Sequence, residues 1–145
     1  MGTIEEFIDQ LSIGDIYWFE NPTISSPDPH PHIYVGKEDE NHLFLICCTS
    51  NFEGRLRHFE INELPFETLV RVKESTENKL TRDTYVDCNE IPPYDVSDLF
   101  YDYKLQYWGK ISEAELLQIR DGISLSELLE AETIERVLSQ FPKDL

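Results

Sequence analysis

The chain has 145 residues, and its 40% hydrophobic and 12% aromatic content is enough to build one hydrophobic core without disulfide staples. Its 29 acidic and 12 basic residues give a formal net charge of −17, which disfavours binding to nucleic acids or anionic membranes through bulk electrostatics. A local basic patch can still bind an anion, and the same negative field attracts a basic protein partner.

Cysteine usage and hydropathy indicate a cytoplasmic protein. The three cysteines, Cys47, Cys48 and Cys88, cannot all pair within one chain, and free thiols are typical of a reducing compartment. No apolar run approaches the roughly 20 residues of a membrane-spanning helix. Residues 1–6 lack the basic and apolar regions of a signal peptide. We therefore expect no membrane association.

The chain opens with the signals of one helix and three strands. Thr3 and Glu6 fit a capping box, and the apolar spacing that follows predicts a helix over residues 4–10. The strands are expected at residues 15–19, 32–35 and 42–49. The third of these is an almost continuous apolar run, which is typical of a strand buried on both faces.

Two polar segments separate these strands. Residues 21–31 carry four prolines, which predicts a long loop, and long loops often lie beside functional sites. Residues 37–41 are expected to form a polar hairpin turn.

The middle of the chain predicts further strands. After a turn at residues 51–54, apolar and polar residues alternate over 55–61, which predicts an edge strand. Further strands are expected at residues 69–72 and 83–88, with a polar loop at 74–79, and the segment is expected to end at Pro92 and Pro93. The aromatic segment at residues 99–108 fits either a strand or a helix.

The last part of the chain predicts helices. Ser112 and Glu115 fit a second capping box, and Gly122 is the expected end of that helix. Ser124 and Glu127 fit a third capping box, followed by apolar residues at roughly helical spacing.

These elements predict an α+β domain that is mainly β. Short strands joined by hairpin-length turns favour antiparallel pairing, and a small curled barrel removes exposed sheet edges. We expect one domain over residues 1–145, with an N-terminal helix at 1–13, a barrel at 14–108 and C-terminal helices at 109–145.

Four short motifs, in this order, resemble the MazF, PemK and Kid family of toxins. They are Gly-Asp-Ile-Tyr-Trp at 14–18, Cys-Thr-Ser at 48–50, Asp-Thr-Tyr-Val at 83–86 and Gly-Lys-Ile-Ser at 109–112. The resemblance implies an SH3-like barrel. It also implies a homodimeric, metal-independent endoribonuclease of a toxin–antitoxin system, with an antitoxin-like protein partner and single-stranded RNA as substrate. No metal or cofactor is expected.

The chain departs from the family pattern at two positions. The family's second strand usually opens with Arg-Pro, and the matching pair here is His30-Pro31. Pro92 stands where a second family arginine is expected. Histidine can act as an acid or a base near neutral pH, but it is a poorer permanent cation than arginine. The alignment makes His30 a candidate catalytic residue.

Thr49 and Ser50 are the other catalytic candidates, because they lie at a predicted strand end where hydroxyl groups can contact a phosphate. Hydroxyls at such positions also commonly bond to the local backbone. Half of the basic residues lie within positions 55–82. We expect four of them to bind an anionic substrate, or else to be solvated edge-strand charges. These four are Arg55, Arg57, Arg71 and Lys73.

Two functional hypotheses remain open. The first is a toxin-like endoribonuclease, and the second is a non-catalytic barrel that binds a protein through its groove and the aromatic segment at 99–108. The electrostatic potential beside Thr49 distinguishes them, because a positive cleft favours RNA whereas a negative or apolar cleft favours a protein. A zinc site is not expected, since His30, His32, Asp28 and the cysteines lack paired ligand spacing.

Overall fold

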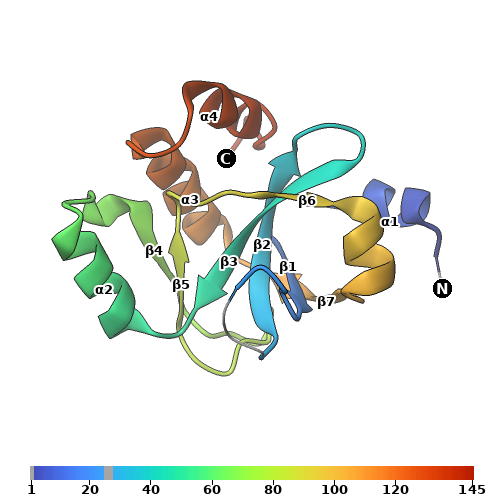
Figure 1. Ribbon diagram of the computed structural model, residues 1–145, viewed down its shortest axis with the longest axis horizontal. Coiled ribbons are helices and arrows are strands. Elements are labelled where there is room, and N and C mark those ends of the chain that lie inside the picture. Colours follow the sequence, from blue (N-terminus) through green and yellow to red (C-terminus); the bar gives the residue numbers. More distant parts are fainter. Residues whose placement is uncertain (1, 25–27) are drawn as a thin grey trace.

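Within residues 2–24 and 28–145, which the computed structural model describes, seven strands form one curled antiparallel sheet (Figure 1). The strands are β1 (Asp15–Phe19), β2 (His30–Lys37), β3 (His42–Thr49), β4 (Leu69–Val72), β5 (Thr84–Asp87), β6 (Pro93–Asp95) and β7 (Gln106–Lys110). Their spatial order is β4-β5-β3-β2-β1-β7, and β6 pairs with β3. The protein is therefore an α+β protein dominated by a curled, half-barrel sheet.

Helices cover both sides of this sheet (Figure 1). The helices are α1 (Ile4–Gln10), α2 (Phe52–Ile61), α3 (Glu113–Leu125) and α4 (Ala131–Leu138), with a 3-10 turn η1 (Phe66–Thr68) and a π-helical turn η2 (Asp98–Asp102). Phe44, Ile46 and Cys48 of β3 pack in a core with α3 and α4, whereas Leu43 and Leu45 pack in a second core beside α1 and η2. The expected burial of β3 on both faces is confirmed.

The start of the chain follows the prediction closely. The Thr3 hydroxyl accepts a hydrogen bond from the Glu6 backbone N–H at 3.1 Å, so α1 begins at its expected cap. Strand β2, however, begins at His30, two residues earlier than expected. His30 and Pro31 are therefore strand residues, because they pair with β1, and not loop residues. Residues 25–27 of the predicted loop lie outside the described residues.

The predicted edge strand over residues 55–61 is wrong, and the turn predicted before it is the first turn of the same helix. The Asn51 side chain accepts a hydrogen bond from the Gly54 backbone N–H at 3.0 Å, which starts α2. A strand would place Phe59 and Ile61 on one face. In the helix Phe59 is 0% exposed and Ile61 is 72% exposed.

The two helix boundaries predicted near the C-terminus are also wrong. Helix α3 continues through Gly122 to Leu125. A Cβ atom at Gly122 would lie 2.9 Å from the Cys88 sulfur, so this glycine permits close helix packing and does not end the helix. The Ser124 hydroxyl donates to the Asp121 carbonyl from within α3, and α4 starts only after Glu130. The capping box at Ser112 and Glu115 is confirmed.

The aromatic segment at residues 99–108, which fitted either a strand or a helix, contains both. It begins as the π-helical turn η2 and continues as β7, which pairs with β1. Pro93 does not end a segment, because it opens β6, and β6 pairs with the beginning of β3. Residues 74–79 form a loop between β4 and β5, as predicted.

Candidate functional site

His30 and Thr49 lie at the same end of the sheet. Strand β2 begins at His30 and its antiparallel neighbour β3 ends at Thr49, so the hairpin brings these two positions together. Both residues line two adjoining hollows, which we call the acidic cleft and the tryptophan cleft. They therefore form the boundary between the two, and Ser50 lines the tryptophan cleft with them.

The acidic cleft has a volume of about 530 Å³. Its charged groups are one arginine, Arg55, and two carboxylates, Asp87 and Glu90. An Nη atom of Arg55 lies 3.2 Å from Oδ2 of Asp87, whose side chain is only 7% exposed. The positive charge of Arg55 is thus neutralised, and the cleft as a whole is negative.

The tryptophan cleft, of about 490 Å³, lies on the other side of His30 and Thr49. Its lining includes Trp18, Trp108, Lys79 and Arg82, with Asp28 as its carboxylate. Cations thus outnumber carboxylates there, in a chain where acidic residues outnumber basic ones more than twofold. The potential beside Thr49 therefore differs between its two sides.

The hydrogen bonds around His30 fix its orientation. Its Nδ1 lies 2.7 Å from the backbone carbonyl oxygen of Asp28. Because a carbonyl only accepts, Nδ1 carries the proton and donates, which leaves Nε2 of the neutral ring as a proton acceptor. This is the arrangement that a general base requires.

A second histidine, His32, supports this end of β2 from inside the protein. Its Nδ1 donates to the His30 carbonyl oxygen at 2.8 Å, and its Nε2 accepts from the Asn21 amide at 3.2 Å. Its ring stacks on Phe19 with 3.8 Å between centroids. Burial lowers the pKa of His32 to about 3, so the ring is neutral at physiological pH and serves as a structural group.

Thr49 presents its hydroxyl at the end of β3. The oxygen accepts a hydrogen bond from the Asn51 backbone N–H at 3.1 Å, and the side chain is half-buried. The hydroxyl proton is free to be donated to a bound anion, since that hydrogen bond uses only an oxygen lone pair. Neighbouring Cys47 is a poor nucleophile, because burial raises the pKa of its thiol to about 11.

The four predicted substrate-binding cations do not converge. Arg55 lies in the acidic cleft, but Arg57 lies outside both clefts because the segment is a helix and not a strand. Arg71 pairs with Asp83 through its guanidinium, at 2.9 Å for Nε, and lies two strands from Thr49, where it lines a hollow beside α2. Lys73 lies outside both clefts as well.

The cations that do lie beside Thr49 and Ser50 are Lys79 and Arg82. Both belong to the basic stretch at residues 55–82, so the sequence contained this signal. No local pattern of residues indicates that Trp18 and Trp108 meet beside them, because that contact depends on the pairing of β1 with β7.

Among the described residues, one group offers ligand atoms that could hold a metal ion: His58, Asp87 and Glu90, whose atoms lie within 4.8 Å of one another. The oxygens of Asp87 already accept hydrogen bonds, one from Arg55 and the other from the backbone and side chain of Asn89. Arg55 therefore competes with a cation for Asp87.

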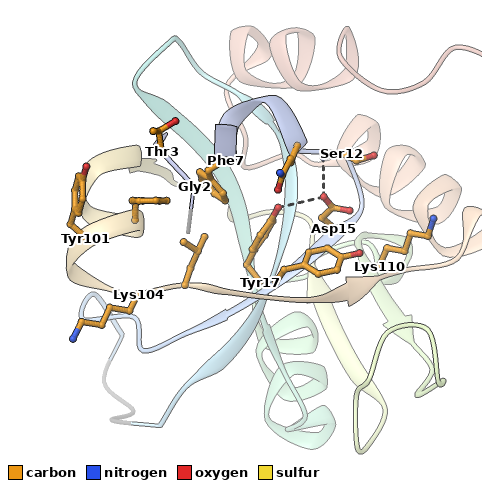
Figure 2. A pocket seen from close by; sticks show the side chains of 13 residues that line it. Gly2, Thr3, Phe7, Ser12, Asp15, Tyr17, Tyr101, Lys104 and Lys110 are labelled. Carbon is orange, nitrogen blue, oxygen red and sulfur yellow. Dashed lines mark hydrogen bonds between the residues drawn. The ribbon is translucent and has the colours of Figure 1, made fainter. Parts of the chain in front are cut away.

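A third hollow, the aromatic groove, lies on the opposite face of β1 and β7 and is shown in Figure 2. It measures about 930 Å³, and Phe7, Tyr17, Tyr101 and Tyr107 are among its lining residues. Figure 2 shows the Tyr17 hydroxyl directed toward Asp15, which also accepts a hydrogen bond from the Ser12 backbone N–H at 2.9 Å. Desolvation raises the pKa of this Asp15 carboxyl.

No model of a known protein family matches this chain, and a search of curated proteins finds no significant match. Within residues 2–24 and 28–145, no helix combines the length and the apolar character needed to cross a membrane.

Proposed function

We propose that this protein binds single-stranded RNA at the boundary between the two clefts and cleaves it without a metal ion. The observation that carries the proposal is the joint position of His30 and Thr49 beside Lys79 and Arg82. RNA can cleave itself when its 2′-hydroxyl attacks the adjacent phosphate. That reaction needs a base, an acid and a cation near the phosphate.

His30 supplies the base in this proposal. Its Nδ1 is committed to the Asp28 carbonyl, so Nε2 is the nitrogen that can take the 2′-hydroxyl proton. The protonated ring can then return a proton to the leaving 5′-oxygen. The Thr49 hydroxyl donates a hydrogen bond to a phosphate oxygen, and this hydrogen bond strengthens as negative charge builds up on that oxygen.

Lys79 and Arg82 supply the positive charge in this proposal. Within the described residues neither side chain forms an ion pair within 4 Å, whereas Arg55 is occupied by Asp87. The carboxylates Asp87 and Glu90 repel phosphate from the acidic cleft. The RNA is therefore expected to lie along the tryptophan cleft.

The resemblance to MazF, PemK and Kid toxins supports the same proposal, because Thr49 lies in one of its motifs and His30 occupies the position where the family usually has an arginine. It extends the proposal to an SH3-like barrel of that type, to a homodimer and to an antitoxin-like protein partner. The two missing family arginines are compensated, in this proposal, by Lys79 and Arg82.

The test is incubation of the purified protein with a mixed RNA in the presence of EDTA, from about pH 5 to about pH 9. Cleavage is expected, and His30→Ala and Thr49→Ala are each expected to slow it by at least about 100-fold. Products should carry a 2′,3′-cyclic phosphate, because the 2′-hydroxyl is the nucleophile. Absence of cleavage across this pH range would overturn the catalytic proposal.

His42→Ala is the matched control. His42 is a partly exposed histidine at the other end of β3, where its Nδ1 bonds to Asp39 at 2.9 Å. It lines neither cleft, so its removal should leave cleavage unchanged. An equal loss in this variant would show that the effect of His30→Ala is not local.

A non-catalytic protein-binding module is the second candidate function, and the aromatic groove favours it. Tyr101 and Tyr107 are 64% and 57% exposed beside this groove, and exposed tyrosines are typical of protein interfaces. In that case the clefts would carry no RNA. A Tyr101→Ser, Tyr107→Ser double variant should then abolish binding of the protein partner, while RNA is neither bound nor cleaved by the unmodified chain.

A further inference from the structure

Trp18 and Trp108 form a stacked pair on the surface of the sheet. Their ring centroids are 5.0 Å apart and their planes differ by 20°. Both are half-buried and both line the tryptophan cleft with His30 and Thr49. An aromatic surface of this kind can extend its stack by one more flat ring.

A β-bulge directs Trp108 into this position. Ile16 pairs with Gly109 and Tyr17 pairs with Tyr107, so Trp108 is the one extra residue of β7 opposite β1. Bulges bend a strand and turn a side chain in a new direction, and they are common next to functional sites. The bulge thus places Trp108 against Trp18, one strand away.

The loop that carries Lys79 is fixed against the same pair. The indole Nε1–H of Trp108 donates to the Lys79 carbonyl oxygen at 2.8 Å. A Cβ atom at Gly109 would lie 2.3 Å from the Glu77 carbonyl oxygen, so the loop and β7 are in direct contact. Lys79 itself has a φ of 56°, a left-handed conformation that is unfavourable for lysine.

A buried asparagine holds this loop closed. Asn78 is 1% exposed, its Oδ1 accepts from the backbone N–H groups of Ser75 and Leu80, and its Nδ2 donates to the Lys73 carbonyl oxygen. The loop therefore presents Lys79 from a fixed backbone, which lowers the entropy lost when the side chain binds an anion.

We propose that the Trp18–Trp108 pair is a base-binding subsite, on which an unpaired nucleobase stacks while Lys79 and Arg82 contact the phosphates on either side. This inference deepens the proposed function and rests on it, since the base belongs to the RNA strand that His30 and Thr49 act upon. Stacking on aromatic side chains tolerates every base, so the subsite binds single strands with little sequence preference.

The test uses a short 2′-O-methyl oligoribonucleotide, which cannot be cleaved through its 2′-oxygen. The chain has only two tryptophans, and both lie in this pair, so tryptophan fluorescence, excited selectively over the seven tyrosines, reports on the subsite. Binding should quench that fluorescence. Trp18→Leu should weaken binding, followed by anisotropy of a labelled oligonucleotide, by about 10- to 100-fold. An oligonucleotide with abasic sugars should lose affinity to a similar extent.

Two further variants keep the test specific. Trp108→Phe retains a ring but removes the bond to Lys79, and it should weaken binding less than Trp18→Leu. Tyr107→Leu is the matched control, because Tyr107 precedes Trp108 in the chain but lines the aromatic groove on the other face. Equal affinity of Trp18→Leu and the unmodified protein, or an unquenched spectrum on binding, would overturn the subsite.

The outcome also separates the subsite from the catalytic proposal. Quenched binding without cleavage of ordinary RNA would support the subsite and overturn the catalytic role of His30. Cleavage of RNA at the normal rate by Trp18→Leu, with no quenching in the unmodified protein, would overturn the subsite and leave the catalytic proposal standing.

Discussion

Adjacent residues of β1 and β7 form two aromatic pairs that face opposite sides of the sheet. Tyr17 and Tyr107 meet edge to face in the aromatic groove, with 5.8 Å between ring centroids, and Trp18 and Trp108 stack in the tryptophan cleft. Because side chains alternate along a strand, the same two strands supply both hollows. The comparison shows how one pair of strands builds two different surfaces.

The two hollows differ in chemistry more than in size. The groove is nearly twice as large, about 930 Å³ against about 490 Å³, and contains two lysines, Lys104 and Lys110. One of them, Lys110, interacts with the Asp15 carboxyl within the groove. The tryptophan cleft combines two cations with the oriented ring of His30 and the hydroxyls of Thr49 and Ser50. These polar and charged groups, and not volume, make the tryptophan cleft the candidate site of the proposed reaction.

The largest expected effect comes from filling the contact between β7 and the loop at Gly109. In Gly109→Ala the new Cβ would meet two backbone atoms, the Glu77 carbonyl oxygen at 2.3 Å and Asn78 Cα at 3.0 Å. Neither can move without displacing Lys79. We expect the free energy of unfolding, measured by urea denaturation, to fall by roughly 3 kcal/mol, and oligonucleotide binding to be lost.

Gly2→Ala, beside the aromatic groove, is the control for that variant. The nearest atoms to its Cβ would all belong to the flexible Glu6 side chain, with Oε2 at 3.2 Å. The free energy of unfolding should change by less than about 0.5 kcal/mol. If Gly109→Ala were equally stable, the fixed position of the loop would be contradicted.

A smaller effect is expected from reversing charges in one hollow at a time. The double variant Lys79→Glu, Arg82→Glu should lower affinity for the uncleavable oligonucleotide by about 30-fold at moderate salt, because two phosphate contacts are lost. The slope of log K against log salt concentration, which is negative, should become less steep by roughly 1.4 for those two contacts.

Lys104→Glu, Lys110→Glu changes the net charge of the protein equally, but in the aromatic groove. If affinity depends on local contacts, this second double variant should bind the oligonucleotide within about threefold of the unmodified protein. Similar losses in both double variants would mean that only the overall charge matters, and the distinction between the two hollows would fail.

The smallest expected effect is on how the free energy of unfolding depends on pH. His32, beneath the tryptophan cleft, and Asp15, in the aromatic groove, change it in opposite directions. His32 below the cleft has a folded-state pKa of about 3, below its ordinary value of 6.5, so the unfolded chain binds the extra proton first as pH falls. Its contribution to stability is complete above about pH 6.5 and is lost progressively toward pH 3. His32→Gln should flatten this acid-side decline, by roughly 1 to 2 kcal/mol between pH 7 and pH 5.

Asp15 in the groove behaves in the opposite way. Its folded-state pKa is raised by desolvation, so the folded chain binds the proton first and stability increases as pH falls toward 3.8. Asp15→Asn should therefore remove a decline in stability with rising pH just above 3.8, as followed by thermal unfolding at each pH. If neither His32→Gln nor Asp15→Asn changed the pH dependence of stability, the opposite effects assigned to His32 and Asp15 would be contradicted.

Much of the fold could be predicted from short stretches of sequence. The caps at Thr3 and Ser112 and the apolar run of β3 depend on residues that are neighbours in the chain, and such signals are local. The alternation at residues 55–61 led to a wrong strand prediction. A period of two over only seven residues also fits a short helix, and in this helix Phe59 is the one buried residue of the seven. The Asn51 cap was the competing local signal.

The sequence by itself determined the strands β1 to β5, the starts of α1 and α3, and the two positions, His30 and Thr49, that the β2–β3 hairpin brings to one end of the sheet. Only the tertiary structure decided which charges and rings surround them. Arg55 is neutralised by Asp87, and Trp108 reaches Trp18 through a bulge. These contacts join segments far apart in the chain, so they depend on strand register and packing, which no local pattern of residues specifies.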